Sequence, residues 1–315
     1  MALKTIRALR VPKESIPSVG DLAKVARQYE ARECKAQEEK HWGFRRFEGR
    51  GNSDEAFVIP LHNSRWRYFE IALNKRILPG PVVKKETEKR AKKLGQARGE
   101  ALSNKEKREL KEEVKIDLLA KSFQREHIYP AIFDVKEQQL WLDATSDSIQ
   151  TDILRLIRRG LGSLPVTPVL ADNQLPSRFA AWIAGNDDLP GVLRIGGSAK
   201  AIDPDEPKAT VTLSHEELMN PDIQRVLESR MIKQLALEND HMTAVLTDAA
   251  VLKSVKVTVD MDDAEADPDH MKTLFCMEVR EFLNDLESEI GADGEPESLG
   301  ESPEPVHESP DVAEP

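Results

Sequence analysis

Residues 66–84 read WRYFEIALNKRILPGPVVK, and within this stretch the pattern changes from that of a strand to that of a helix. Apolar and polar side chains alternate up to Leu73, which is the pattern of a half-buried strand. Pro79 and Pro81 follow, and proline cannot donate to a sheet ladder but is tolerated in the first turn of a helix. We therefore predict a strand over 66–73, a break at the prolines, and a helix over about 82–99.

A second helix is predicted directly after the first, so that the two form a helical hairpin. Ser103 and Glu106 have the S-x-x-E spacing of a capping box, which begins a helix. Each helix has an apolar stripe at helical spacing, formed by Val83, Thr87, Ala91 and Leu94 on the first and by Leu110, Val114 and Leu118 on the second. Residues 75–115 contain fourteen Lys or Arg against seven Glu, a local charge of +7. A protruding hairpin with a basic surface is expected.

The patterns outside the hairpin favour an α+β fold, because strands and helices mix without regular βαβ repetition. Further strands are expected at 5–9, in a hairpin over 131–144, and in a second hairpin formed by 243–246 and 252–260. Further helices are expected at 22–29, 148–160, 177–184 and 269–290, and one more begins at Asn220 and carries Ile232 and Leu235 on its apolar stripe. Ser214 and Glu217 form a second predicted capping box, and most of 170–207 is expected to be connection.

These elements divide the chain into four regions. Residues 1–78 and 126–170 form a central α+β region, 79–125 the basic helical-hairpin tip, and 171–290 a second α+β region at the base. Residues 291–315 carry eight acidic residues, five prolines and no Lys or Arg, so we predict a disordered acidic tail. The net charge of the chain is −11, which by itself argues against a nucleic-acid binder. Much of that charge lies in the tail, however, and the hairpin has the opposite sign.

The sequence gives no sign of a metal site or a cofactor. Cys34 and Cys276 have no CxxC spacing, and the seven histidines include no pair at ligand spacing, so a zinc site is not expected. We predict a reduced, intracellular protein, because no signal peptide precedes residue 10 and no apolar run of about 18 residues is present.

Several motifs resemble those of one known family. In order, they are residues 74–84, Leu118-Leu119 with Phe123, Phe133-Asp134, Leu142-Asp143 and residues 160–166, with weaker matches at Leu213, at Glu216-Glu217 and at residues 233–237. Their order and spacing over about 66–170 are similar to the recombination-associated protein RdgC family, whereas the match before Trp66 is poor.

This resemblance implies a horseshoe-shaped α+β subunit that closes tip-to-tip and base-to-base into a dimeric ring. It also implies that duplex DNA passes through a positively lined hole, and that the protein opposes a recombinase, in the cytoplasm and on the nucleoid. Phe123 corresponds to a family phenylalanine at the tip-to-tip contact and is flanked by Lys121 and Arg125. The chain departs from the family at Thr210 and Val211, where the family has basic and amide residues at the base, and in its acidic tail.

Two groups of basic residues are candidates for contact with DNA phosphates. The full candidate set is Lys75, Arg76, Lys85, Lys89, Lys92, Lys93, Lys121, Arg125, Arg155, Arg158 and Arg159. Lysines and arginines on a duplex release condensed counterions and give affinity without sequence preference. The alternative for the hairpin lysines is a solvated helix face paired with glutamates. The alternative for the three arginines of 148–160 is a subunit contact.

Two other functions stay open. Asp134, Asp143 and Glu137 are close in the predicted 131–144 hairpin and could hold Mg²⁺ for a DNA exonuclease. However, the spacing of a metal nuclease is missing, and aspartates at strand ends usually cap turns, so we expect no catalytic residue. An acidic protein-interaction scaffold that mimics DNA is the third possibility. Trp66 and Tyr68 could stack on single-stranded bases, but a place in the core or an interface is the expectation.

Overall fold

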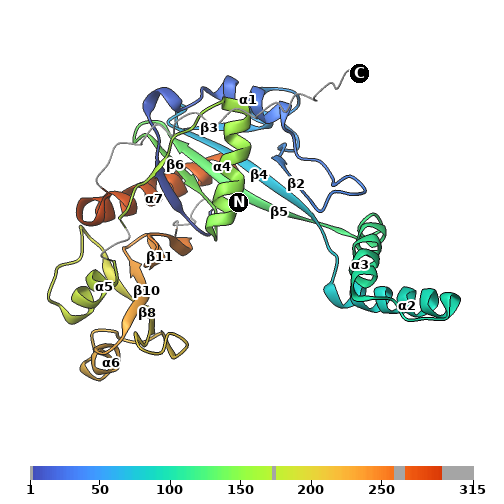
Figure 1. The fold of residues 1–315 in the computed structure, drawn as a ribbon. Helices are drawn as coiled ribbons and strands as arrows, with labels where there is room; N and C mark the ends of the chain where they lie inside the picture. Colours follow the sequence, from blue (N-terminus) through green and yellow to red (C-terminus); the bar gives the residue numbers. More distant parts are fainter. Residues whose placement is uncertain (1–2, 172–174, 259–266, 293–315) are drawn as a thin grey trace, which may run out of the picture.

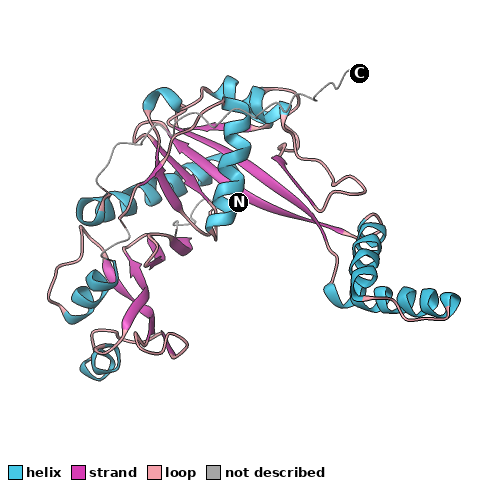
Figure 2. Ribbon diagram, viewed as in Figure 1, coloured by secondary structure: helices cyan, strands magenta, loops and turns pink. Residues whose placement is uncertain are grey.

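The computed structural model describes residues 3–171, 175–258 and 267–292, and this part of the chain has the predicted α+β fold (Figures 1 and 2). One antiparallel sheet consists of β1 (Arg7–Arg10), β2 (Lys40–Phe44), β3 (Val58–Leu61), β4 (Trp66–Arg76), β5 (Gln124–Asp134), β6 (Gln139–Leu142) and β7 (Thr167–Pro168). A second consists of β8 (Arg194–Ile202), β9 (Thr210–Ser214), β10 (Met231–Glu238), β11 (Met242–Thr247) and β12 (Leu252–Val257).

Helices cover these sheets or extend from them. They are α1 (Val19–Gln28), α2 (Gly80–Arg98), α3 (Asn104–Leu119), α4 (Asp147–Leu161), α5 (Leu175–Ala184), α6 (Pro221–Leu227) and α7 (Pro268–Ile290), with short 3₁₀ helices at Lys13–Ser15 and Asp54–Ala56. None of the helices in the described ranges is long and apolar enough to cross a membrane. Of the predicted acidic tail, residues 293–315 lie outside the described residues, and Gly291 bridges to Leu170.

The first sheet is built around one long pair of strands. Its order is β2-β4-β5-β6-β1-β7, and β3 pairs with β4 along the same edge as β2. β4 and β5 pair without a break from Trp66 opposite Asp134 to Arg76 opposite Gln124. Eleven residues of strand extend about 35 Å, so this ribbon reaches beyond β3 and β6, while β2 pairs with it as far as Lys75. The helical hairpin of α2 and α3 lies at its far end (Figure 1).

The two faces of the first sheet pack against different partners because side chains alternate along β4. Phe69 and Ile71 point to the side covered by α1 and α4 and belong to the core formed there. Trp66 and Tyr68 point to the opposite side, where the core includes Phe282 of α7. Trp66 and Tyr68 are both almost fully buried, so the core reading of these two aromatic residues is confirmed and base stacking on them is not available.

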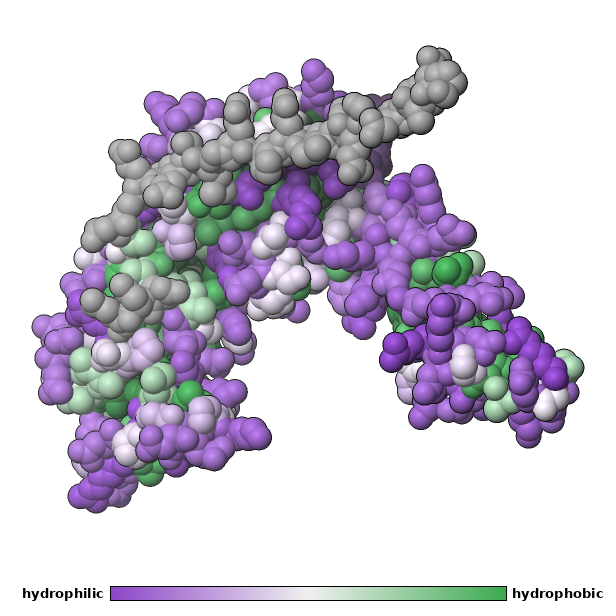
Figure 3. All heavy atoms as spheres, viewed as in Figure 1, coloured by the Kyte–Doolittle hydropathy of each residue, from purple (hydrophilic) through white to green (hydrophobic). Residues whose placement is uncertain are grey.

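The second sheet shares a core with the first. Its order is β12-β11-β10-β8-β9, and α5, α7 and β10 contribute to the same buried cluster as Trp66 and Tyr68. The backbone N–H of Ile6 donates to the carbonyl of Leu252 at 2.8 Å and connects the two sheets directly. The second sheet and the helical hairpin therefore extend from different parts of the first sheet, with an open concave side between them (Figure 3).

Three predictions for the second region were wrong. The helix that begins at Asn220 ends at Leu227, and Ile232 and Leu235 lie on β10 instead. Both are buried. Two buried residues three positions apart fit a helix, and they also fit this strand because its pairing with β8 shifts in register between Ile232 and Gln234. β8 occupies nine residues of 170–207 that were assigned to connection. Ser214 is the last residue of β9, and Glu217 is followed by turns rather than by a helix.

Candidate nucleic-acid interface

The helical hairpin forms as the sequence predicts, with a small core of its own. Ser103 caps α3, since its hydroxyl accepts from the N–H of Glu106 while the Glu106 carboxylate accepts from the N–H of Ser103. Gly99 ends α2 in the left-handed conformation, with φ of 81°. The buried core of the hairpin consists of Val83, Leu102, Leu110 and Val114, with Leu78, Ala91 and Leu118 packed against it. This cluster is separate from both cores of the sheets, so the hairpin is a packing unit in its own right.

Arg76 holds the root of the hairpin. Its guanidinium donates to the carbonyls of Cys34 at 2.9 Å, Ser122 at 3.0 Å and Lys35 at 3.3 Å. Three carbonyl acceptors occupy most of the five donors of an arginine. Arg76 was a predicted phosphate contact, and in this structure its guanidinium joins the loop before β2 to the connection between α3 and β5.

The predicted hairpin lysines are exposed. Lys85, Lys92 and Lys93 form no ion pair with any described residue. Lys89 lies 3.6 Å from the Glu86 carboxylate, so the alternative of a face paired with glutamates holds for this residue. The other lysines place positive charge on the α2 surface without forming an ion pair to a described residue.

A row of cations crosses the first sheet on the face covered by α1 and α4. Lys40 on β2 is the register partner of Lys75 on β4, and Lys75 is the register partner of Arg125 on β5. Register partners lie on the same face of a sheet with their Cβ atoms about 5 Å apart, and like charges placed this way destabilise the sheet. Among the described residues, Lys75 and Arg125 form no ion pair. We call Arg155, Lys40, Lys75 and Arg125 the cation row.

One carboxylate connects the row to α4. Asp152 accepts from Lys40 Nζ at 2.8 Å and from Arg155 at 2.8 Å, so two of the four basic side chains pair with a carboxylate. Lys75 lies near Glu39, and its charge helps to lower the pKa of that carboxyl. The structure thus brings together three of the predicted residues, Lys75, Arg125 and Arg155, from three separate segments. It adds Lys40, which the sequence reading missed because only the strand register places it beside Lys75.

The three arginines of α4 do not present one uniform face. Arg155 and Arg159 are exposed, and the Arg159 guanidinium lies over the ring of Tyr29. Arg158 is half-buried, its Nε donates to the carbonyl of Leu164 at 3.0 Å, and burial lowers its pKa. Arg158 thus has a structural partner at the end of the helix, and Arg155 and Arg159 are the two that project into solvent.

Phe123 is the most exposed large apolar side chain in the described residues, at 86%. It follows α3 directly, and its neighbours Lys121 and Arg125 are exposed as well. Ile77, whose N–H donates to the Phe123 carbonyl, and Val82 and Ile116 on the hairpin are also about half exposed. Figure 3 shows apolar side chains on the surface of this lobe. A solvated phenylalanine of this size favours a partner surface.

The predicted carboxylates each have structural partners. Asp134 is fully buried and accepts from Trp66 Nε1 at 3.0 Å and from the N–H groups of Lys136 and Glu137. Asp143 accepts from the N–H groups of Lys4 and Thr5, and burial raises its pKa. No group of three or more possible metal ligands occurs in the ranges that the structure describes.

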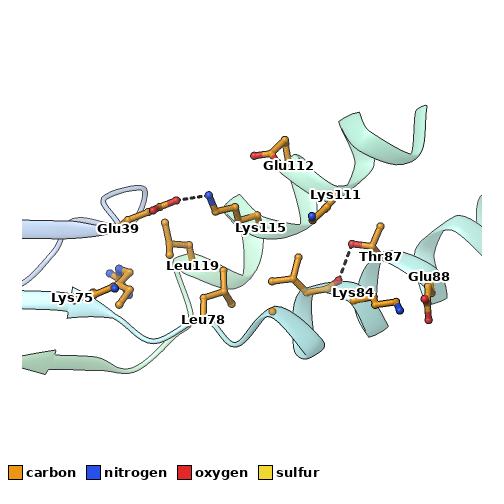
Figure 4. Close-up of a pocket in the computed structure, with 13 residues that line it drawn as sticks. Glu39, Lys75, Leu78, Lys84, Thr87, Glu88, Lys111, Glu112, Lys115 and Leu119 are labelled. Carbon is orange, nitrogen blue, oxygen red and sulfur yellow. Dashed lines mark hydrogen bonds and ion pairs between the residues drawn. The ribbon is translucent and has the colours of Figure 1, made fainter. Parts of the chain in front are cut away.

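The sequence reading also missed a groove of about 600 Å³ at the root of the hairpin. It lies where α2 and α3 approach the ends of β2 and β4, and several lysines line it together with Glu39 (Figure 4). Lys111 and Lys115 stand at i and i+4 on α3, which was the available signal. Lys84 faces them from α2 only because the hairpin folds back.

Comparisons with known proteins agree with the resemblance seen in the motifs. Residues 1–293 match the family model described as "Putative exonuclease, RdgC". The "Recombination-associated protein RdgC" of Xanthomonas oryzae pv. oryzae (strain PXO99A) is 28% identical over 248 residues, which is 75% of this chain and 82% of the relative. The protein of the same name from Actinobacillus pleuropneumoniae serotype 5b (strain L20) is 33% identical over 204 residues, or 62% of this chain and 66% of the relative.

Proposed function

The chain belongs to the RdgC family, and on that premise we propose that it binds double-stranded DNA without sequence preference as a ring-shaped dimer and restrains recombination driven by a recombinase. The observation that carries the proposal is the cation row, in which Lys75 and Arg125 are register partners on adjacent strands and neither forms an ion pair with a described residue. Such a row gains stability when an anion binds it. The regularly spaced phosphates of a duplex are such an anion.

The absence of sequence preference follows from the residue types in the candidate interface. Its exposed cations include Lys85, Lys92 and Lys93 on α2 and Arg155 and Arg159 on α4. Lysine binds a phosphate as a point charge on a flexible stem, and phosphate contacts position a protein on DNA without reading its bases. The proposed interface therefore takes any duplex, and its affinity depends on salt.

Ring closure is the second part of the proposal. In this proposal the subunit acts as a horseshoe, with the hairpin at one tip and the second sheet at the other end. A twofold contact places the same surface of each subunit against the other. Phe123 is the anchor of the hairpin contact, since an exposed aromatic residue that becomes buried at an interface centre contributes much of the binding energy. At the opposite contact the chain departs from the family, because Thr210 and Val211 on β9 stand where the family has basic and amide residues.

The proposed role is binding rather than catalysis, with no cofactor, although the family description names an exonuclease. Asp134 and Asp143 both have backbone N–H partners that a structural aspartate takes. The DNA-mimic alternative rests on the acidic whole-chain charge, and the cation row weighs against it. A recombination-associated DNA binder acts in the cytoplasm, on the nucleoid.

The experiment that tests the ring uses circular and linear duplexes of equal length. Protein is loaded at low salt and then challenged at high salt, where phosphate contacts weaken. A closed ring stays on the circle and slides off the linear ends, so retention on the circle should be several times higher. Equal retention on both forms would contradict ring closure. A strand-exchange assay with a bacterial recombinase then measures the restraint directly.

A further inference from the structure

The groove at the root of the hairpin combines a basic rim with an apolar floor. Leu78, Val83 and Leu119 lie at its base. The rim carries lysines from three elements, with Lys84 on α2, Lys111 and Lys115 on α3, and Lys75 on β4 (Figure 4). The acidic side chains that line it are Glu39, Glu88 and Glu112, and the rim also includes Arg76, whose guanidinium is held by backbone carbonyls.

Most of these lysines have no carboxylate partner. Among the described residues, Lys75, Lys84 and Lys111 form no ion pair. They converge on one cavity from elements that the chain brings together only by folding back at residues 99–103. Cations that face a shared space repel one another, and an anion placed between them relieves that repulsion.

One anion of this kind is already present. The Glu39 carboxylate lies 2.5 Å from Lys115 Nζ. The pKa of Glu39 is lowered, first by the hydrogen bond from Lys115 and by its charge, and also by the charge of Lys75. The carboxylate is therefore held ionised between two lysines. Both members of the pair are partly exposed, and exposed ion pairs contribute little to stability, so an anion that contacts several of the lysines at once can displace Glu39.

We propose that this groove is a phosphate site for the DNA backbone, and that Glu39 is its built-in competitor, which occupies Lys115 until a phosphate replaces it. The inference rests on the proposed DNA-binding function and adds to it a site and a means of regulation. Lys75 belongs both to the groove and to the cation row, so the site extends the proposed phosphate path from the sheet onto the hairpin.

Displacement of Glu39 also changes how the hairpin is held. The Glu39–Lys115 pair joins α3 to the residue before β2. The backbone of Glu39 stays in place, because its carbonyl accepts from the N–H of Arg76 at 2.9 Å. Phosphate binding thus removes one side-chain contact between hairpin and sheet, while the backbone bond from Glu39 to the end of β4 stays intact. DNA binding in the groove and the freedom of the hairpin are coupled.

The first test replaces the competitor. Glu39→Gln keeps the shape of the side chain and removes its charge, so duplex binding at low salt should tighten about three-fold, as expected for loss of one exposed ion pair. The matched control is Glu113→Gln, which removes the same charge from an exposed position of α3 outside the groove. Equal gains for the two variants would mean that only net charge matters, and the groove assignment would be wrong.

The second test combines that change with loss of the lysines. In a Lys84→Ala, Lys111→Ala background the gain from Glu39→Gln should disappear, because the phosphate has lost the two lysines that face it from the hairpin besides Lys115. A Lys105→Ala, Lys107→Ala background removes the same charge from exposed positions of α3 outside the groove and should keep the gain. Persistence of the gain in both backgrounds overturns the proposal. Circular dichroism and melting temperature establish that each variant is folded.

Tripolyphosphate separates the site from the wider function. Titration calorimetry at low salt should detect its binding to the full chain, tighter binding to Glu39→Gln, and loss of binding in the double lysine variant. If this pattern holds while duplex DNA fails to bind, the groove stands as a phosphate site and the proposed function fails. If duplex DNA binds and both groove variants behave like their controls, the groove inference fails and the proposed function stands.

Discussion

The backbone N–H of Ile77 donates to the carbonyl of Phe123 at 2.8 Å. This bond continues the ladder of β4 and β5 one step past Arg76 and Gln124, and beyond it the chain enters the hairpin. Its position fixes the backbone of Phe123 while the side chain remains 86% exposed. An apolar ring on an ordered backbone loses little freedom when it binds, which makes Phe123 a suitable anchor for a second subunit.

Phe123→Glu should therefore open the hairpin contact. A hot-spot aromatic residue contributes about 2 kcal/mol or more, and a buried carboxylate adds a desolvation cost. Analytical ultracentrifugation should show a more open or dissociated assembly, and retention on circular DNA should fall. Leu94→Glu, at another exposed apolar position of the hairpin, is the control. Unchanged sedimentation together with unchanged retention would refute the role of Phe123.

Duplex affinity should fall steeply with salt, by about 0.9 in log K per log salt for each phosphate contacted. Lys75→Ala with Arg125→Ala removes two cations of the row, so the slope should become shallower by about 1.8. Fluorescence anisotropy with a labelled duplex at several salt concentrations measures it. Lys208→Ala, an exposed lysine between β8 and β9, should leave the slope unchanged, and an equal slope for the double variant would remove the row from the interface.

Linear duplex DNA incubated with the protein and Mg²⁺ should remain intact. The carboxylates that a metal would need accept hydrogen bonds from Trp66 and from backbone N–H groups instead. End-labelled DNA on a denaturing gel provides the measurement, with a known exonuclease as the positive control. Digestion that Asp143→Asn abolishes would replace the binding proposal with an enzymatic one.

Arg280→Ala should destabilise the region where α7 meets the first sheet. Arg280 is buried, donates to Gln139 Oε1 at 2.8 Å, and pairs with Glu287. Removing one member of a buried ion pair costs about 3–5 kcal/mol, which urea denaturation can measure. The exposed pair of Arg194 and Asp240 gives the comparison, since Arg194→Ala should cost about 0–1 kcal/mol. Similar losses for the two variants would contradict the buried role.

Glu106 should titrate well below an ordinary glutamate. The N–H and hydroxyl of Ser103, with Arg98, hold its pKa at about 2, against an ordinary value of 4.5. A depressed folded-state pKa gives stability that is present above pH 4.5 and is lost as the pH falls through about 2. Carboxyl ¹³C NMR can follow the titration, and Ser103→Ala should raise the midpoint part of the way. A wild-type midpoint near 4.5 would show that the capping box is absent.

Local signals predicted the parts of the fold that depend on neighbouring residues. Pro79 and Pro81 mark the end of β4 and the start of α2, and Ser103 with Glu106 marks the start of α3, because these effects act within one turn. β8 gave no such signal. It contains Gly196-Gly197, and the Cβ of Ala236 would lie 3.0 Å from a Cβ at Gly196. The two strands approach closely here because glycine has no side chain, and a search for alternating apolar residues does not detect such a strand.

The sequence predicted which residue types form the candidate interface but not which of them become neighbours in space. Lys75 and Arg125 are fifty positions apart, and only the β4–β5 register makes them partners. The same limit explains Arg76 and Arg158, since backbone carbonyls from distant segments or past a helix end occupy their donors. A count of positive charges along a sequence cannot distinguish these two arginines from those that face solvent.

The separate core of the hairpin has a consequence for its local unfolding. Only four buried apolar side chains form that core, while the sheets are held by two far larger clusters. Segments with few buried contacts unfold in sub-global steps whose free energy is well below that of the whole molecule. Amide protons of α2 and α3 will therefore exchange with solvent deuterium through excursions that leave β4 and β5 protected. In the proposed ring, a tip that unfolds and refolds on its own would let the closed assembly admit DNA while the sheets stay folded.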